Sequence, residues 1–454
     1  MHKFDDKASK ILLNVLSHTI ERLSMDPPTL DYPKSVKFFE QNAKSLISEA
    51  GNSIDTVFDQ YKNTIEQSII SVDSPRNLAF IPAAPTKASM IFDLVVSAGS
   101  LCGVSWQEAS GAVWAENQVI RWIADLVGLP ESAGGCFVAG GTNGNLSSLV
   151  VAREEFRKKK SGSSKRLAIL CSDQTHSSVK STAIVMDCEV IVVSTNESFQ
   201  LTRERIENEL ESHSEKYENF DIFAVVATAG TTNLGVIDDI KGISDFAKKN
   251  KIWFHVDGAY GGAGLLSDNV KDLFSGVENA DSFIVDPHKW LFAPLDCAAV
   301  IYRDKSLAAE VHAQKASYLD ILHDDEEGDN PSDYAFHLSR RARGLPLWFS
   351  LSVYGVEAYR NAVESSLNIA SYTADVIQRS EHLSLLIKPT LSIVAFERIG
   401  WDWSDYKSWS KKQLKKQICF VVPSSVRGAP ILRFAFVNPG TTEAIVDEIL
   451  LSLE

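Results

Sequence analysis

Two stretches of the sequence decide the fold: IWFHVDGAYGG at residues 252–262 and SFIVDPHKW at residues 282–290. Each begins with a short apolar run, at 252–256 and 282–285, that is typical of a buried β-strand. An aspartate and a turn then follow, and the second stretch adds Lys289. Carboxyl ends of parallel strands meet at one edge of a sheet, so Asp257 and Lys289 are expected to share that edge.

The same alternation extends outward along the chain. Apolar, β-branched runs predict further strands, amphipathic stretches between them predict helices, and we therefore expect an α/β fold with a mostly parallel sheet. The strands are expected at residues 136–138, 167–171, 190–193, 223–228 and 298–302, and the helices at 145–160, 202–213 and 240–249.

The two ends of the chain have different patterns. Apolar residues at helical spacing between Leu12 and Leu23, and again over residues 36–50, predict an N-terminal helical arm over residues 1–75 that packs on something else, such as another subunit. A helix pattern after Arg343 and strand-like runs at 391–396, 418–422 and 431–436 predict a small C-terminal α+β domain. The expected division is therefore 1–75, 76–343 (the large domain) and 344–454.

Composition restricts the partners. The net charge of −14 argues against nucleic acid or an anionic membrane as the main partner. The six cysteines are scattered, as expected for free thiols in a reducing compartment, and no segment approaches the roughly 18 apolar residues of a membrane span. We expect a cytoplasmic protein, and we assign no metal ligands. Residues 323–333 hold six acidic residues of eleven, which predicts a loop that does not pack.

The pair formed by Lys289 and Asp257 points to pyridoxal phosphate (PLP). A lysine amine forms an imine with the cofactor's aldehyde, and a carboxylate keeps the pyridine nitrogen protonated so that the ring can accept electrons. Alone, each residue has an ordinary explanation: aspartate and glycine are common in turns after strands, and a lone lysine is usually solvated. Their joint position at strand ends favours the chemical interpretation.

Three more motifs follow predicted strands. AGGTNGNL at residues 139–146 opens a helix, and glycines, a threonine hydroxyl and helix N-terminal amides together can bind phosphate. DQTHSS at 173–178 places His176 where an imidazole can stack on a pyridine ring. AGTTN at 229–233 offers hydroxyl groups at the same edge. Each of these three signals is weak by itself.

As an ordered set, these motifs resemble the PLP-dependent amino-acid decarboxylases of the aromatic-L-amino-acid and glutamate decarboxylase group, which have fold type I. The resemblance runs from about Ser74 to Phe436. It implies a large aminotransferase-type domain with a mostly parallel seven-stranded sheet, a small C-terminal domain, and an intertwined homodimer embraced by the arm. Two positions depart from the family: relatives often carry Asn at Asp286, and often Glu-Ala at Asn143-Gly144.

The resemblance also implies roles at the cofactor. Lys289 would carry PLP, Asp257 would bind the pyridine nitrogen, and His176 and Ala259 would cover the two faces of the ring. The remaining implied contacts are Gly141 and Thr142 at the phosphate, Asp286 and His288 beside them, and Thr232 near the ring. Arg433 matches an arginine of the family's small domain whose role stays open.

The reaction implied is decarboxylation. Tyr318 matches the tyrosine of the family's catalytic loop, and its hydroxyl can protonate the substrate carbon with His176 as orienter or relay. Related enzymes with Phe at this position tend toward aldehyde formation. The segment that resembles the side-chain pocket is apolar and favours an aromatic substrate such as tyrosine, tryptophan, phenylalanine or dihydroxyphenylalanine. Its residues are Phe80, Ile81 and Pro82, with Cys102 and Val104 expected from the neighbouring subunit.

Four alternatives stay open. The substrate could be an acidic or diamino acid, namely glutamate, aspartate or 2,4-diaminobutyrate. The enzyme could be a PLP-dependent aldehyde synthase, which consumes O₂, or an aminotransferase. A protein of another class, a non-catalytic binding protein, would usually have lost Lys289, Asp257 or Tyr318, and all three are present.

Overall fold

The computed structural model describes residues 2–314 and 328–454. Seven strands form the central sheet in the order β1-β7-β6-β5-β4-β2-β3. Strand β7 runs antiparallel to both β1 and β6, and every other pair is parallel, which confirms the expected mostly parallel sheet. The strands are β1 (Gly134–Val138), β2 (Arg166–Ser172), β3 (Glu189–Val193), β4 (Phe220–Thr228), β5 (Trp253–Asp257), β6 (Ser282–Val285) and β7 (Ala298–Tyr302).

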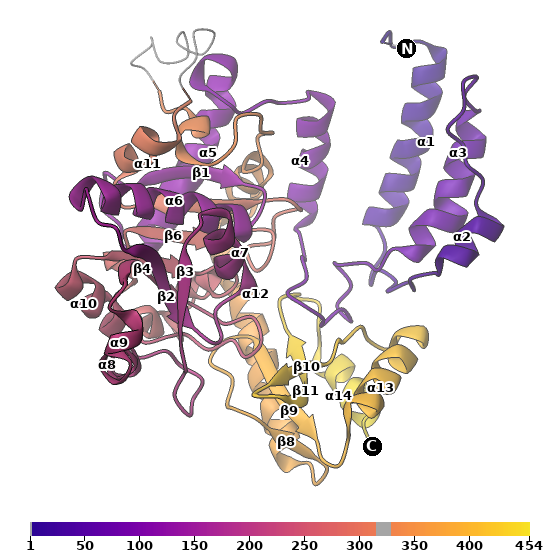
Figure 1. Cartoon of the computed structure of the whole chain (residues 1–454). Helices are drawn as coiled ribbons and strands as arrows, with labels where there is room; N and C mark the ends of the chain where they lie inside the picture. Colours follow the sequence, from indigo (N-terminus) through magenta and orange to yellow (C-terminus); the bar gives the residue numbers. More distant parts are fainter. Residues whose placement is uncertain (1, 315–327) are drawn as a thin grey trace.

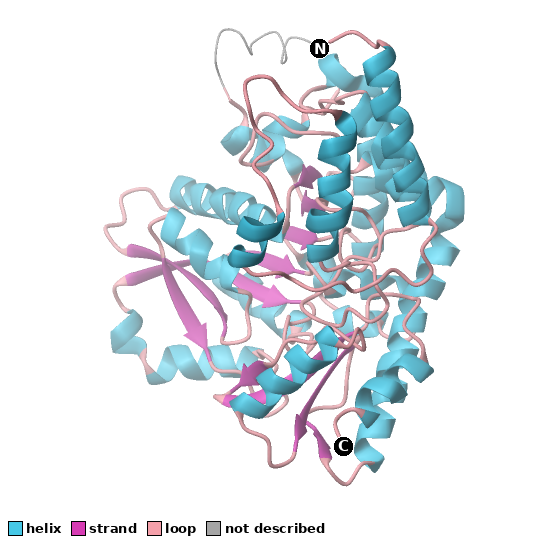
Figure 2. Ribbon diagram, turned by 90° about the vertical axis from the view of Figure 1, so that its right-hand side faces the viewer, coloured by secondary structure: helices cyan, strands magenta, loops and turns pink. Residues whose placement is uncertain are grey.

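Helices cover both faces of this sheet (Figure 2). Strands β1, β5, β6 and β7 are buried along their whole length, which explains their continuous apolar runs. Helices α5, α10 and α12 pack on one face, and α6, α7 and α11 pack on the other. The helices of this part are α4 (Lys87–Ala98), α5 (Trp106–Val127), α6 (Gly141–Lys159), α7 (Ser177–Val185), α8 (Arg203–Ser212), α9 (Ser214–Tyr217), α10 (Ile240–Asn250) and α11 (Lys305–His312).

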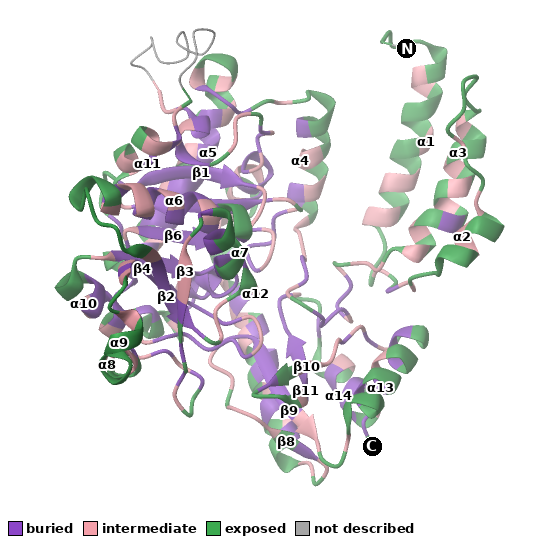
Figure 3. Ribbon diagram, in the orientation of Figure 1, coloured by how far each residue is buried: buried purple, intermediate pink, exposed green. Residues whose placement is uncertain are grey.

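The N-terminal segment forms three helices that stand beside the rest of the chain (Figure 1). They are α1 (Asp6–Leu23), α2 (Val36–Asn42) and α3 (Ile54–Gln60). None of the three buries a residue, and Figure 3 shows them mostly in the colours of exposed and intermediate residues. The helix expected over residues 36–50 ends early, because the backbone of Ala43 turns to an extended conformation.

The C-terminal segment begins with the long helix α12 (Leu345–Arg379), which is kinked at Gly355. A second sheet follows, with the strand order β10-β11-β9-β8 and antiparallel pairing throughout. Its elements are β8 (Leu383–Leu385), β9 (Ile393–Arg398), α13 (Trp403–Lys415), β10 (Ser424–Val426), β11 (Ala429–Ala435) and α14 (Glu443–Leu451). The division into domains at 75/76 and 343/344 stays a prediction.

Two local predictions are wrong. Residues 418–422 form no strand of this sheet, because the backbone of Phe420 bonds instead to Arg76 and Leu78. The acidic segment also packs where it is described: the Asn330 side chain accepts a bond of 2.9 Å from the backbone of Trp106, and Ser332 is buried. Among the helices of residues 2–314 and 328–454, none is long and apolar enough to cross a membrane.

Candidate active site

A cavity of about 310 Å³ lies at the carboxyl ends of strands β1, β2, β4, β5 and β6. This is the edge at which ligands bind in open α/β sheets. Every residue that the sequence assigned to the cofactor lies in its wall, so the fold brings together five motifs spread over 150 residues of chain. The predicted residues in the wall are Gly141, Thr142, His176, Thr232, Asp257, Ala259, Asp286, His288 and Lys289.

Lys289 is held by a carboxylate. Its Nζ lies 2.9 Å from Oδ2 of Asp286, the first residue after β6. His288 Nε2 lies 3.6 Å from the same oxygen, while His288 Nδ1 accepts a bond of 3.0 Å from the backbone N–H of Cys297. That bond puts the proton of the neutral ring on Nε2, toward Asp286. Burial lowers the pKa of His288, which favours the neutral ring.

Asp257 is the last residue of β5 and is buried. Its Oδ1 accepts a bond of 3.1 Å from the backbone N–H of Ala259, and its Oδ2 accepts one of 3.0 Å from Nδ2 of Asn145. Each carboxylate oxygen keeps a free lone pair, so the carboxylate can still accept a proton-bearing ring nitrogen.

The N-terminus of α6 closes another side of the cavity. Helix α6 begins at Gly141 without a side-chain cap, so its first backbone N–H groups are available to a ligand. A Cβ on Gly141 would lie 3.0 Å from Oδ1 of Asp286 and 3.3 Å from Cβ of Ala259. Glycine is therefore needed here for the close approach of the helix to β5 and β6. The amides and the Thr142 hydroxyl can donate to a phosphate, Asp257 can accept from a ring nitrogen and Lys289 can form an imine, so the residues of this cavity fit PLP.

His176 caps the N-terminus of α7, after strand β2. Its Nδ1 lies 2.9 Å from Oγ of Ser178 and also accepts a bond of 3.2 Å from the Ser178 backbone N–H. Thr232 follows β4 and also lines the cavity. An imidazole held through Nδ1 keeps Nε2 for the proton, which fixes the ring's tautomer.

Other predicted residues lie elsewhere. Tyr318 falls outside the described residues. In residues 2–314 and 328–454 the five apolar substrate positions do not line this cavity: Phe80 is exposed and lies against Phe420, Cys102 is exposed, and Ile81, Pro82 and Val104 are at least half-buried. Arg433 is buried in β11, and burial lowers its pKa to about 10.

Asn145 and Ser178 also line the cavity, and the sequence motifs that contain them gave them no role. His255, which contacts Asn145 from β5, was not predicted either. A signal was present, because His255 lies two residues before Asp257 and alternate residues of a strand face the same side. Leu295 and Tyr260 also line the cavity.

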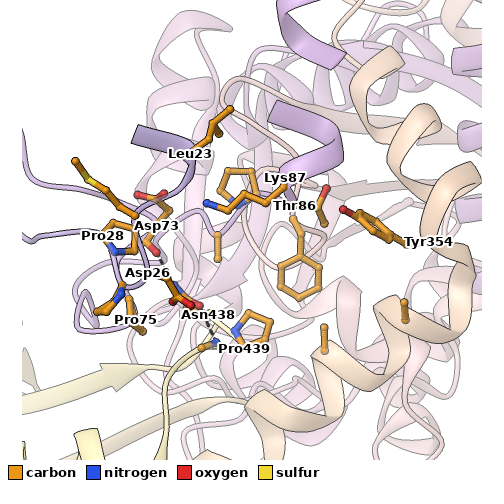
Figure 4. A pocket seen from close by; sticks show the side chains of 18 of the residues that line it. Leu23, Asp26, Pro28, Asp73, Pro75, Thr86, Lys87, Tyr354, Asn438 and Pro439 are labelled. Atoms are coloured by element: carbon orange, nitrogen blue, oxygen red, sulfur yellow. Dashed lines mark hydrogen bonds between the residues drawn. The ribbon is translucent and has the colours of Figure 1, made fainter. Parts of the chain in front are cut away.

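A larger cavity, of about 780 Å³, shares no lining residue with this one (Figure 4). It is lined by the segment after α1, by α12 and by the loop before α14, including Leu23, Asp73, Tyr354 and Asn438. Asp73 already pairs with Arg22 at 2.6 Å, and Asn438 donates to the Asp73 backbone. Among the described residues that line this larger cavity there is no histidine beside a lysine and an aspartate. We therefore assign the chemistry to the smaller cavity, despite its smaller volume.

Comparison with known proteins identifies the family of the chain. The family model of the pyridoxal-dependent decarboxylase conserved domain matches residues 39–399. An aromatic-L-amino-acid decarboxylase of Bacillus atrophaeus is 27% identical over 419 residues, which are 90% of this chain and 86% of that one. An L-2,4-diaminobutyrate decarboxylase of Acinetobacter baumannii is 29% identical over 348 residues, or 72% of this chain and 68% of that one.

A solved structure has the same fold. The crystal structure of Oryza sativa TDC with PLP and tryptamine superimposes with a TM-score of 0.91 at 22% identity. The match covers 100% of this chain and 99% of that chain, so it includes the arm and both sheets.

Proposed function

The chain belongs to the pyridoxal-dependent decarboxylase family, and from this premise we propose that it converts an aromatic L-amino acid to its amine and CO₂, with Lys289 as the cofactor-carrying residue. PLP-dependent decarboxylation of an amino acid is the activity of the family. The observation that carries the residue assignment is the meeting of Lys289 and Asp257 in one cavity, at the ends of neighbouring strands β6 and β5.

The cofactor, when bound, supplies two groups. Its aldehyde condenses with an amine, and its protonated pyridine ring accepts electrons. Asp257 would hold the proton at the ring nitrogen, and His176 and Ala259 would contact the ring. The amides at the start of α6, with Gly141 and Thr142, would bind the phosphate. Asp286 and His288 would position the Lys289 amine, and Thr232 would contribute its hydroxyl near the ring.

Tyr318 delivers the proton that replaces the lost carboxyl group on the substrate's Cα, with His176 as orienter. Tyrosine at this position favours amine formation over the oxidative release of an aldehyde. This assignment rests on the sequence motif around Tyr318, which lies outside the described residues.

Two observations support an aromatic substrate: the relative that is an aromatic-L-amino-acid decarboxylase aligns with 90% of this chain, and residues 80–82 are apolar. The diaminobutyrate decarboxylase has a comparable sequence identity, 29% against 27%, so a diamino acid is the second candidate substrate. The apolar positions do not line the cavity within one chain, which fits a pocket completed by a second copy.

We infer that the protein is a homodimer in which each arm covers the partner. Helix α1 carries Leu13 and Ile20, which are 65% and 63% exposed, and α4 carries the exposed residues Ile91 and Val95. Apolar surface of this extent calls for a partner, and a second copy supplies a matching face. Cys102 and Val104 would then reach the partner's site. A cytoplasmic location stays a prediction.

The function is tested with the purified holoenzyme and a panel of L-amino acids. CO₂ and amine in equal amounts from an aromatic substrate, without O₂ uptake, is the expected result. CO₂ released only from 2,4-diaminobutyrate or glutamate would support decarboxylation and replace the aromatic substrate by a diamino or acidic one. Aldehyde, ammonia and peroxide with O₂ uptake would identify an aldehyde synthase, and a keto acid without CO₂ would identify an aminotransferase.

A further inference from the structure

A buried chain of polar side chains connects the interior of the sheet to the cavity. Trp253 Nε1 donates to Oγ of Ser282 at 2.8 Å. The same oxygen lies 2.8 Å from Nδ1 of His255, and Nε2 of His255 lies 2.8 Å from Oδ1 of Asn145. All four residues are buried, between strands β5 and β6 and helix α6.

At Asn145 the chain divides into two branches. Its Nδ2 donates to Oδ2 of Asp257 at 3.0 Å and to Oγ of Ser178 at 2.8 Å. The second branch continues to His176, whose Nδ1 lies 2.9 Å from Oγ of Ser178. One amide group therefore contacts the carboxylate assigned to the cofactor's ring nitrogen and, through one hydroxyl, the imidazole assigned to the ring face.

The direction of the hydrogen bonds is fixed at Asp257, because its carboxylate oxygen accepts there and Nδ2 of Asn145 is the donor. Oδ1 of Asn145 therefore faces Nε2 of His255, and Nδ1 of His255 accepts from the Ser282 hydroxyl, whose oxygen accepts from the Trp253 indole. Burial lowers the pKa of His255 and keeps the ring neutral, so its proton lies on Nε2 and is donated to Oδ1 of Asn145. Both amide hydrogens of Asn145 face Asp257 and Ser178.

The consequence reaches both groups at the cofactor. One amide hydrogen is donated to Oδ2 of Asp257 and fixes the orientation of its carboxylate in the cavity. The other occupies a lone pair of the Ser178 hydroxyl, which then donates to Nδ1 of His176 and leaves the imidazole proton on Nε2. We propose that Asn145 is a positioning residue that holds Asp257 as an acceptor for the pyridinium and, through the Ser178 hydroxyl, reinforces the His176 tautomer that the Ser178 backbone N–H favours. This inference rests on the proposed roles of those two residues.

Asn145→Asp tests the first branch, because it keeps the shape of the side chain and removes the donor. Two carboxylates would then face each other, and the one at Asp257 would hold the pyridinium less firmly. The PLP dissociation constant, measured by equilibrium dialysis, is expected to rise at least about tenfold. The pH midpoint of the bound cofactor's absorbance is expected to move from its wild-type value.

Ser178→Ala tests the second branch, because it leaves the bond between Asn145 and Asp257 in place. Cofactor affinity is expected to stay within about twofold, while kcat falls about tenfold with KM unchanged. Asn250→Asp makes the same atom exchange at the end of α10, where the amide bonds to the Phe246 backbone, and is the control expected to change neither readout.

Thermal unfolding of each variant separates a positioning role from a structural one. Lower stability with unchanged affinity and pH midpoint in Asn145→Asp would overturn the proposal, as would identical effects of the two variants. Failure of the proposed function has another signature: wild-type protein that releases no CO₂ from any amino acid, whatever Asn145 does to PLP binding.

Discussion

Lys289 Nζ lies 2.9 Å from Oδ2 of Asp286, and this carboxylate is almost fully buried, with 3% of its side chain exposed. Its Oδ1 has no hydrogen-bond partner among the described residues, and it faces Gly141 at the start of α6. The same carboxylate therefore neutralises the lysine and stands beside the helix terminus assigned to phosphate. Both effects weaken the attraction of this end of the cavity for an anionic ligand.

Asp286→Asn is expected to tighten cofactor binding. It removes a buried negative charge beside the phosphate site and keeps the size of the side chain. The PLP dissociation constant should fall about fivefold or more, as followed by equilibrium dialysis. Asp245→Asn, which loses an exposed carboxylate paired with Lys241, is the matched control. Weaker binding in Asp286→Asn would mean that the carboxylate holds the cofactor rather than repels it.

Asp257→Asn is expected to have the opposite effect. The amide cannot keep the ring nitrogen protonated, so kcat should fall at least about a hundredfold and PLP should dissociate more readily. Steady-state assays of CO₂ release with excess PLP check the first result, and dialysis checks the second. A wild-type kcat in Asp257→Asn would contradict the proposed role of Asp257 at the ring nitrogen.

The sequence predicts the strand ends well, because buried parallel strands have continuous apolar runs and ligand-binding residues follow them. The sequence alone could therefore place Lys289, Asp257 and His176 at one edge of the predicted sheet. Asn145 and His255 could not be assigned roles in this way, since their function depends on contacts between elements about 110 residues apart. Phe80 shows another limit: its apolar character predicted a pocket wall, yet in one chain it is exposed. A local apolar pattern does not tell whether a residue lines a pocket of its own chain or contacts a second copy.

Charges placed on the arm should dissociate the protein into single chains. In Leu13→Glu/Ile20→Glu, two exposed apolar residues of α1 become anionic, so a partner surface would have to bury charge. Size-exclusion chromatography with light scattering is expected to give twice the chain mass for the wild type and one chain mass for the variant. Lys3→Glu, on an exposed residue outside the helices, should leave the mass unchanged. A monomeric wild type would contradict the dimer.

Stability should depend on the ionisation of Asp238. Burial raises the pKa of Asp238 to about 7, although it accepts backbone bonds from Leu201 and Thr228. Between pH 3.8 and about 7 the folded carboxyl stays protonated while the unfolded one ionises. The unfolded state then binds fewer protons, so this group's contribution to stability is lost as pH rises through that window.

The Asp238 prediction is checked by denaturant unfolding at several pH values. Relative to Asp238→Asn, the wild type should lose up to about 4 kcal/mol between pH 4 and 7. The variant has a constant offset from its changed hydrogen bonds, so the slope with pH is the relevant quantity. Parallel pH profiles for the two proteins would contradict the buried, protonated carboxyl.

Borohydride reduction of the holoenzyme shows whether Lys289 carries PLP, when it is followed by peptide mass spectrometry of the wild type, Lys289→Ala and the exposed control Lys241→Ala. A pyridoxyl group is expected on the peptide containing Lys289 in the wild type and the control, and none is expected in Lys289→Ala. A pyridoxyl group on another lysine, or equal labelling in Lys289→Ala, would contradict the proposal that Lys289 carries PLP.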